Sequence, residues 1–320
     1  MKVLVTGGAG FIGSNLCRRL IDEPTVGEVR VMDDFSTGFR DNLDGLPVDL
    51  REGSILNEEL LADAVRGCDA VVHLAALGSV PRSVGDPLHS HEVNATGTLK
   101  VLLAARESDA HVVLSSSSSV YGANPGVPKS EEMQCLPMSP YAVSKLATEQ
   151  YAMAFAECYS LAVLPFRFFN VYGPRQRAGH AYAAVIPAFL DAALHGRPIP
   201  LNGDGRQSRD FTFVGTVCEL LAAAIVARTT STPTNLAFGS RTNLRELIAM
   251  IASALGTDLV VEERPARPGD VAHSQADNSQ LQRLFPATAP VSLEDGLQET
   301  VAWMRSLPEV SESSSGPTNH

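Results

Sequence analysis

Tyr141 and Lys145, in the run YAVSK, are the residues of this chain with the clearest potential for chemistry. On a helix, side chains four positions apart share one face, so a phenol and an ammonium would lie together. A tyrosine phenol has a reference pKa of about 10, and a neighbouring ammonium favours its phenolate form. A serine from the run Ser115 to Ser119 could hold a substrate oxygen while the phenolate takes its proton. A Tyr-x-x-x-Lys pair is also common on exposed helix faces, so an alcohol-oxidising site requires a hydride acceptor nearby.

The first residues of the chain, KVLVTGGAGFIG, offer a site for such an acceptor. Aliphatic residues predict a buried strand at 2–6 and apolar spacing predicts a helix after it, with three glycines between them: Gly7, Gly10 and Gly13. The turn lets the backbone approach a ligand, and the start of the helix presents free N–H groups that suit a pyrophosphate. Asp33 ends the next apolar run, where a carboxylate binds the adenosine ribose of NAD. A turn without a ligand is the alternative. Arg40 is close enough in sequence to suit NADP, although the acid favours NAD.

The elements that must position these residues alternate between strand and helix. Apolar runs predict strands at 28–33, 69–74, 111–114 and 161–168, and helices at 57–65, 86–107 and 141–158. This order predicts an α/β fold, a Rossmann-like doubly wound parallel sheet with helices on both faces. We expect an NAD-binding domain at 1–170, to which segments of about 210–240 return. A smaller C-terminal α/β substrate-binding domain is expected at 171–306, and a disordered tail rich in serine at 307–320.

The composition restricts the partners. The 320 residues carry a net charge of −11 and no basic cluster, which argues against nucleic acid. The five cysteines are odd in number and show no paired motif, as expected of free thiols in the cytoplasm. We find no signal peptide and no apolar run long enough to span a membrane. His89 and His91 are two residues apart on a predicted helix and do not share a face, so no metal site is predicted.

The chain resembles the extended short-chain dehydrogenases/reductases, in their branch of nucleotide-sugar epimerases and dehydratases. The motifs that carry the resemblance run to near residue 300: TGGAGFIG from Thr6, HLAAL from His73, SSSSSVYG from Ser115, YAVSK from Tyr141, RFFNVYGPRQ from Arg167 and RPGD from Arg267. The resemblance implies tightly bound NAD, a UDP-sugar substrate and a homodimer. It implies that NAD is bound by Gly7, Gly10, Phe11, Ile12, Gly13, Asp33, Ser54, Ile55, Leu74, Ala75, Ala76, Asn94, Tyr141 and Lys145. Ser54 stands where the family usually has an aspartate near the adenine.

Within this branch, the serine run favours an epimerase. Similar dehydratases and decarboxylases carry an acid just after the catalytic hydroxyl, whereas the run Ser117 to Ser119 contains none. The resemblance makes Ser117 the catalytic serine and Ser118 its helper. It implies that Tyr141 takes the proton of the sugar 4-hydroxyl while C4 passes a hydride to NAD. The 4-keto sugar would then turn over, and hydride and proton would return on its opposite face.

The resemblance also implies how the substrate is held. Arg209 and Arg267 would pair with the diphosphate, because guanidinium groups match phosphate oxygens, although without the family they read as solvated surface. Asp270 would bind the uridine ribose. The small side chain of Ser274 would leave room for an N-acetyl group, where galactose-specific epimerases have a bulky residue. The substrate residues implied are Gly78, Ser79, Ser117, Asn170 (diphosphate or sugar), Ala184, Val185, Leu201 (facing the uracil), Arg209, Arg267, Asp270 and Ser274.

Among members of this branch, the chain is most similar to 4-epimerases that interconvert UDP-N-acetylglucosamine and UDP-N-acetylgalactosamine. A UDP-glucose/UDP-galactose or UDP-glucuronate 4-epimerase is the alternative. A non-catalytic, NAD-sensing protein on the same fold is a third hypothesis, and the intact Tyr141, Lys145 and Ser117 argue against it.

Overall fold

The computed structural model describes residues 1–177, 184–266 and 272–307. Its main element is a seven-stranded sheet in the order β11-β6-β5-β4-β1-β2-β3, with every pairing parallel. The strands are β1 (Lys2–Thr6), β2 (Glu28–Asp33), β3 (Asp49–Glu52), β4 (Ala70–His73), β5 (His111–Ser117), β6 (Val163–Phe168) and β11 (Thr234–Leu236). The chain order reverses at β1, which is the arrangement of the predicted doubly wound fold.

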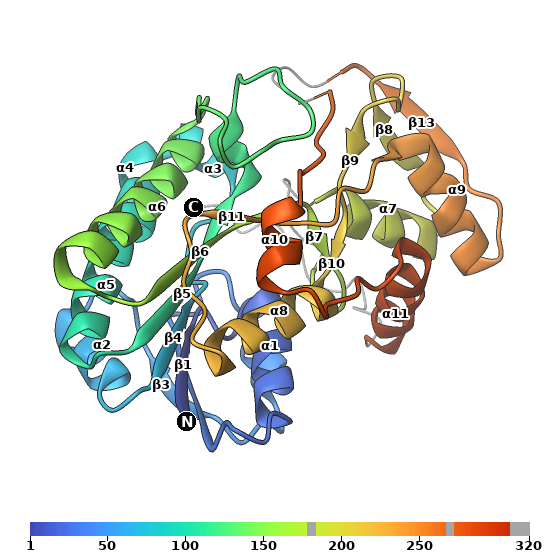
Figure 1. The fold of residues 1–320 in the computed structure, drawn as a ribbon. Helices are drawn as coiled ribbons and strands as arrows, with labels where there is room; N and C mark the ends of the chain where they lie inside the picture. The colour runs from blue at the N-terminus through green and yellow to red at the C-terminus, as the bar shows by residue number, and fades with distance from the viewer. Residues whose placement is uncertain (178–183, 267–271, 308–320) are drawn as a thin grey trace, which may run out of the picture.

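Helices cover both faces of this sheet (Figure 1). One face carries α1 (Phe11–Ile21) and α8 (Val214–Val226), and the other carries α2 (Glu58–Val65), α5 (Gly97–Glu107) and α6 (Pro140–Tyr159). Successive residues of a strand point to opposite faces. Val3 and Val5 accordingly belong to the core beneath α1 and α8, while Leu4 belongs to the core beneath the other three helices. Burial on both faces explains why the central strands β1 and β4 are largely apolar, whereas the edge strand β3 alternates with charged residues.

A smaller mixed α/β region follows the sheet, as predicted, and lies beside its β6 and β11 end (Figure 1). It contains three two-stranded sheets: β7 (Val171–Tyr172) with β10 (Thr212–Phe213), β9 (Ser208–Arg209) with β12 (Thr242–Asn243), and β8 (Ile199–Asn202) with β13 (Val261–Arg264). Its helices are α7 (Val185–Leu194), α9 (Leu244–Leu255), α10 (Ser279–Leu284) and α11 (Leu293–Ser306).

The helix predicted at 86–107 is confirmed, with one irregularity inside it. Helical residues run without a break from 87 to 107 as α4 (Pro87–His91), a π-helical turn η2 (Glu92–Thr96) and α5, and a separate short helix α3 (Val80–Gly85) precedes them. Asn94 lies in the π-helical turn, where its side chain accepts a hydrogen bond from the Leu77 N–H at 2.8 Å and donates to the Leu77 carbonyl. The Thr98 hydroxyl donates to the Asn94 carbonyl at 2.5 Å in the same segment.

Two predictions from composition can be compared with the structure. None of the described helices is long and apolar enough to cross a membrane. The five cysteines are free, as predicted.

Replacing Gly13 with alanine should destabilise the fold, because a Cβ there would lie 2.2 Å from the carbonyl oxygen of Gly7. Backbone atoms cannot rotate away, so we expect the free energy of unfolding to fall by at least about 2 kcal/mol. Chemical denaturation measures this loss. Gly27→Ala is the matched control, because no atom lies within 4 Å of a Cβ at that position. Equal stability of the two variants would contradict the packing described here.

Candidate active site

A cavity of about 580 Å³ lies at the carboxyl ends of the central strands. The glycine turn after β1, the ends of β2, β4 and β5, and the start of α6 all contribute to its wall. Open parallel sheets bind ligands in this crevice, where the strand order reverses. Most predicted cofactor residues line it: Gly7, Gly10, Phe11, Ile12, Gly13, Asp33, Ile55, Leu74, Ala75, Ala76, Tyr141 and Lys145.

The glycine turn leaves an anion-binding helix end open to the cavity. Gly7 has a positive φ of 70°, and a Cβ on it would lie 2.7 Å from the backbone nitrogen of Ala75. Gly10 precedes α1 without a side chain to cap it, and the first turn of α1 carries no acid. The free N–H groups and the helix dipole therefore favour a pyrophosphate at this end.

Asp33 is held at the end of β2 by two backbone N–H groups. Its carboxylate accepts hydrogen bonds from Ala9 and Phe35, both at 2.8 Å. Burial raises the pKa of Asp33, and these two bonds oppose the rise. Arg40 is not part of the cavity wall; it pairs with Glu52 and stacks 4.1 Å from the centroid of the Phe35 ring. Asp33, and not Arg40, therefore faces the cavity at the end of β2, as expected of a site for NAD.

Tyr141 and Lys145 lie in the first two turns of α6, as predicted. Ser139 caps this helix by accepting a hydrogen bond from the Ala142 N–H at 3.1 Å, and Pro140 occupies its first turn. Lys145 is 5% exposed, and its ammonium donates to the Ser115 carbonyl at 2.8 Å. Burial lowers the pKa of Lys145 to about 8, against the opposing charge of Glu149.

The phenol has a local partner in the serine run. Burial raises the pKa of the Tyr141 phenol, and its hydrogen bond with Ser117 opposes this rise. The ammonium of Lys145, four residues further along α6, donates to Ser115. The positive charge of a nicotinamide ring would add to that of the ammonium in favouring the phenolate.

The serine run places one hydroxyl at the phenol. Ser117 lines the cavity and accepts hydrogen bonds from the N–H of Ser119 at 3.2 Å and from its hydroxyl at 2.9 Å. Ser118 belongs to the 3-10 turn that follows β5 and is not among the cavity residues. The chain therefore brings Ser117, but not its predicted helper Ser118, to the catalytic end.

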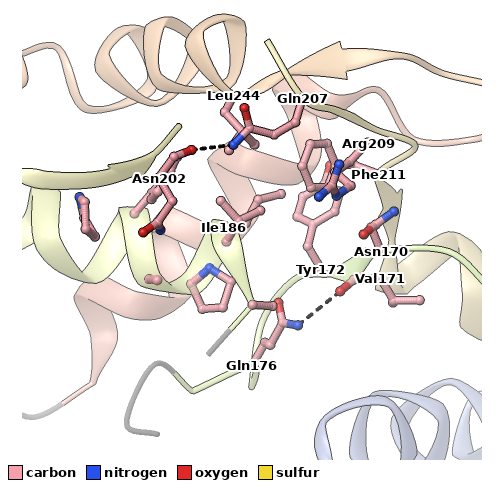
Figure 2. A pocket seen from close by; sticks show the side chains of 16 residues that line it. Asn170, Val171, Tyr172, Gln176, Ile186, Asn202, Gln207, Arg209, Phe211 and Leu244 are labelled. Atoms are coloured by element: carbon pink, nitrogen blue, oxygen red, sulfur yellow. Dashed lines mark hydrogen bonds between the residues drawn. The ribbon is translucent and has the colours of Figure 1, made fainter. Parts of the chain in front are cut away.

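A second cavity of about 270 Å³ adjoins the first, and Asn170 lines both. Figure 2 shows it between Asn202 and Gln207 on one side and Arg209, Phe211 and Asn170 on the other. Of the predicted substrate residues, Ala184, Val185 and Arg209 line this cavity, whereas Gly78, Ser79 and Ser117 line the larger one. The two cavities together could accommodate an extended ligand that carries a cofactor-facing group and an anionic centre near Arg209.

Other predicted substrate residues lie elsewhere. The side chain of Leu201 cannot face a ligand, because it is fully buried in the core. Strand alternation along β8 instead directs Pro200 and Asn202 to the cavity. Ser274 lines neither cavity, but its N–H donates to the carbonyl of Ser208, the neighbour of Arg209. Arg267 and Asp270 lie outside the described residues.

Two predicted cofactor residues also lie outside the cavity wall. Asn94 is buried, and its amide is bonded to Leu77 and Ser144, so it positions the end of β4 rather than lining the site. The Ser54 hydroxyl accepts a hydrogen bond from the N–H of Leu56, and its neighbours Gly53 and Ile55 line the cavity.

Sequence reasoning missed the basic residues after β7. Arg175, Gln176 and Arg177 line the larger cavity. Arg175 donates to the Asn15 side chain on α1 at 3.1 Å, and Arg177 pairs with Asp41. Through these contacts the segment lies against both α1 and the loop after β2. Two arginines separated by one residue, just after a strand, were the signal that could have indicated an anionic ligand.

The comparisons with known proteins agree with this geometry. Residues 3–237 match the family model described as the NAD dependent epimerase/dehydratase family. The chain belongs to this family. It is 37% identical to a UDP-glucose 4-epimerase of Mycolicibacterium smegmatis, over 95% of this chain and 99% of the relative.

Two solved structures of the family are closely similar. A UDP-N-acetylglucosamine 4-epimerase from Methanobrevibacter ruminantium, in complex with UDP-N-acetylmuramic acid, has a TM-score of 0.90 at 37% identity, over 95% of this chain and 98% of that one. A Thermus thermophilus UDP-glucose 4-epimerase in complex with NAD has a TM-score of 0.86 at 35% identity, over 96% of this chain and 99% of that one. This member of the epimerase/dehydratase family is an NAD-dependent enzyme acting on nucleotide sugars.

Replacing Tyr141 with phenylalanine should lower turnover by about 10²- to 10⁴-fold, because we expect the phenol to act as the acid and base of the site. The bound NAD should be retained, since the glycine turn and Asp33 are unchanged. Turnover is measured with a UDP-sugar by NMR, and NAD by chromatography of the denatured protein. Tyr151→Phe is the control, because this tyrosine lies on the same helix and is 40% exposed. Undiminished turnover in Tyr141→Phe would refute the assigned base.

Proposed function

We propose that this epimerase/dehydratase family member is a 4-epimerase that interconverts UDP-N-acetylglucosamine and UDP-N-acetylgalactosamine. The observation that carries the epimerase assignment is that no described acid lines the larger cavity at its Tyr141 and Ser117 end. Among the described residues that line the larger cavity, the carboxylates are Asp33 and Asp34, both at the adenosine end. A dehydratase or decarboxylase needs a further proton-transfer group beside the sugar, whereas a 4-epimerase needs only the phenol and a hydroxyl.

The residues then have distinct roles. NAD, when bound, supplies the acceptor that takes a hydride from the sugar C4 and returns it to the same carbon. Tyr141 takes the proton of the 4-hydroxyl and later gives it back, so no net oxidation occurs. Ser117 orients the reacting oxygen of the sugar. The positive charge of Lys145, together with that of bound NAD, favours the phenolate form of Tyr141. Arg209 pairs with the diphosphate, which leaves the sugar free to turn over.

The choice of sugar rests on size. Small residues line the catalytic end near the sugar position, including Gly78, Ser79 and Ser117. Ser274 lines neither cavity, but its backbone pairs with that of Ser208, beside Arg209. That its small side chain leaves room for an N-acetyl group is what the resemblance implies for this position. A structurally similar relative is named as a UDP-N-acetylglucosamine 4-epimerase, which favours the same substrate class.

A UDP-glucose/UDP-galactose 4-epimerase is the second candidate, because the Mycolicibacterium relative carries that name at the same identity. A UDP-glucuronate 4-epimerase is the third candidate, and Arg82, which lines the larger cavity with Gly78 and Ser79, is a cation of the kind that a sugar carboxylate would need. The discriminating experiment is a panel of these three UDP-sugars, read by NMR at equal concentration. Turnover of UDP-glucose or UDP-glucuronate without turnover of UDP-N-acetylglucosamine would overturn the proposed substrate.

Replacing Ser274 with tyrosine should remove most activity on UDP-N-acetylglucosamine while UDP-glucose is still accepted. If this position borders the sugar, as the resemblance implies, a bulky ring there excludes the N-acetyl group, and such steric exclusion is worth at least about 10-fold in kcat/KM. The ratio of kcat/KM for the two sugars is the measurement. Ser274→Ala is the control, since it adds no volume. An unchanged ratio in Ser274→Tyr would contradict the role of this position.

We also propose that the enzyme is a homodimer, and its cytoplasmic location stays a prediction from the free cysteines. The exposed apolar side chains gather on helices α3, α4 and α6, where Val84 is 65%, Leu88 82% and Val143 51% exposed. These helices pack together at one edge of the molecule (Figure 1). Burying that face against a second copy would remove apolar surface from water.

Replacing Leu88 with glutamate should weaken the dimer, because it places a charge in the centre of this apolar face. Light scattering after size-exclusion chromatography should give a dimer mass for the parent protein and a larger monomer fraction for the variant. Val260→Glu is the control, because Val260 is 70% exposed and precedes β13, away from these helices. A monomeric parent protein would refute the proposal.

A further inference from the structure

A buried ion pair lies one turn of α6 beyond Lys145. Glu149 on α6 is fully buried, and Arg167 on β6 is 5% exposed. Two parallel hydrogen bonds join them: Nε of Arg167 to one carboxylate oxygen at 2.9 Å, and an Nη of Arg167 to the other at 2.8 Å. The cost of dehydrating two charges usually offsets the attraction between them, so such a pair contributes little net stability. Its presence beside an active site therefore calls for another explanation.

Glu149 continues the line of catalytic residues along α6. Tyr141, Lys145 and Glu149 are each four residues apart, so they share the face of the helix that packs on the sheet. Residues of β5 bond to Lys145 and Glu149 in the same order. Ser115 accepts a hydrogen bond from the Lys145 ammonium, and the next residue, Ser116, donates its hydroxyl to Glu149 at 2.5 Å. Two consecutive residues of β5 thus bond to two consecutive turns of α6.

The other side of the pair is tied to the edge of the sheet. Arg167 donates to the Tyr121 hydroxyl at 2.9 Å, and that hydroxyl donates to the Asn235 side chain on β11 at 2.6 Å. The Asn235 amide donates in turn to the Lys129 carbonyl at 2.8 Å. Tyr121 and Asn235 are buried, so water does not compete for these bonds. The network fixes Glu149 relative to β5, β6 and β11 at once.

Electrostatics give this placement a consequence for Lys145. Burial lowers the pKa of Lys145, and Glu149 is the carboxylate that opposes this. The other groups that face the ammonium supply no negative charge at neutral pH: Ser115 on β5 is neutral, and burial lowers the pKa of His73 on β4 to about 3. Tyr141 is one turn away, and Arg167 on β6 lies beyond Glu149 with its charge already paired.

We propose that Glu149 is a positioning residue for catalysis: held by Arg167 and Ser116, it keeps Lys145 charged and fixes α6 against the end of β5. It touches neither substrate nor cofactor and acts through Lys145. The proposal rests on the alcohol-oxidising chemistry of this enzyme and not on which UDP-sugar it accepts.

The test is the pH dependence of kcat in Glu149→Gln. The parent enzyme should lose activity as pH rises through about 8, where Lys145 loses its proton. Without the carboxylate, the charged form of Lys145 is less stable, so this alkaline limb should move to lower pH by about one unit or more. Glu149→Asp should restore part of the shift. Glu157→Gln, an exposed acid on the same helix, should leave the profile unchanged.

Glu149→Gln leaves Arg167 buried without its partner and could fail to fold for that reason. The double variant Glu149→Gln/Arg167→Met removes both charges and should recover thermal stability while it keeps the shifted limb. The proposal would be overturned if kcat fell at every pH while the alkaline limb stayed at the same pH. This applies to the double variant and to any single variant that folds, and it would leave Glu149 a structural residue.

A second readout separates this proposal from the assigned function. An NMR titration of ¹³Cε-labelled lysines gives the pKa of Lys145 directly, with its signal assigned by its loss in Lys145→Arg. The pKa of Lys145 should fall in Glu149→Gln whether or not any UDP-sugar is turned over. An unchanged pKa of Lys145 overturns the role of Glu149, whereas absence of turnover with the expected pKa change would refute only the proposed substrate.

Discussion

The site depends on keeping a positive charge inside the protein. Lys145 is almost fully buried between α6 and the sheet, and its ammonium rests on the backbone carbonyl of Ser115. Burying a cation is costly unless polar groups replace the water that it loses. The end of β5 supplies those groups, so the strand that ends in serines also determines where the catalytic helix can lie. Tyr141 follows from this, because it lies one turn before Lys145 on the same face.

The second constraint is the geometry of a parallel sheet. All strands of the large sheet end at the same edge, and the glycine turn, Asp33 and the serine run are each placed there by the end of a different strand. Residues far apart in the sequence are therefore brought to one cavity without long loops. The segment after β7 completes the wall, since Arg175 and Arg177 contact α1 and the loop after β2. The two adjoining cavities offer a helix N-terminus and arginines, groups that suit the phosphates of a nucleotide cofactor and a nucleotide sugar.

Much of this could be predicted from the sequence because the signals are local. The glycine spacing, Asp33, and the Tyr141–Lys145 pair each lie within a single turn, strand end or helix, so the pattern alone predicted where they lie. The inaccurate predictions concern contacts between distant segments. Leu201 was expected to face a ligand, but strand register buries it in the core. The helix expected at 86–107 forms, but its π-helical turn was not predicted, since Asn94 there bonds to Leu77, seventeen positions earlier. The pairing of Glu149 with Arg167 depends on how α6 docks on β6, which no local pattern specifies.

We propose above all that C4 of the sugar loses a hydride and regains it, with NAD as the acceptor that the cavity would hold and Tyr141 as the acid and base. Deuterium at C4 of the UDP-sugar tests this most directly, in ordinary water with the purified enzyme. The account predicts that the epimerised product, analysed by NMR and mass spectrometry, keeps its deuterium at C4. Loss of that deuterium to solvent, with epimerisation intact, would show that C4 is inverted through a proton rather than a hydride and would contradict the account.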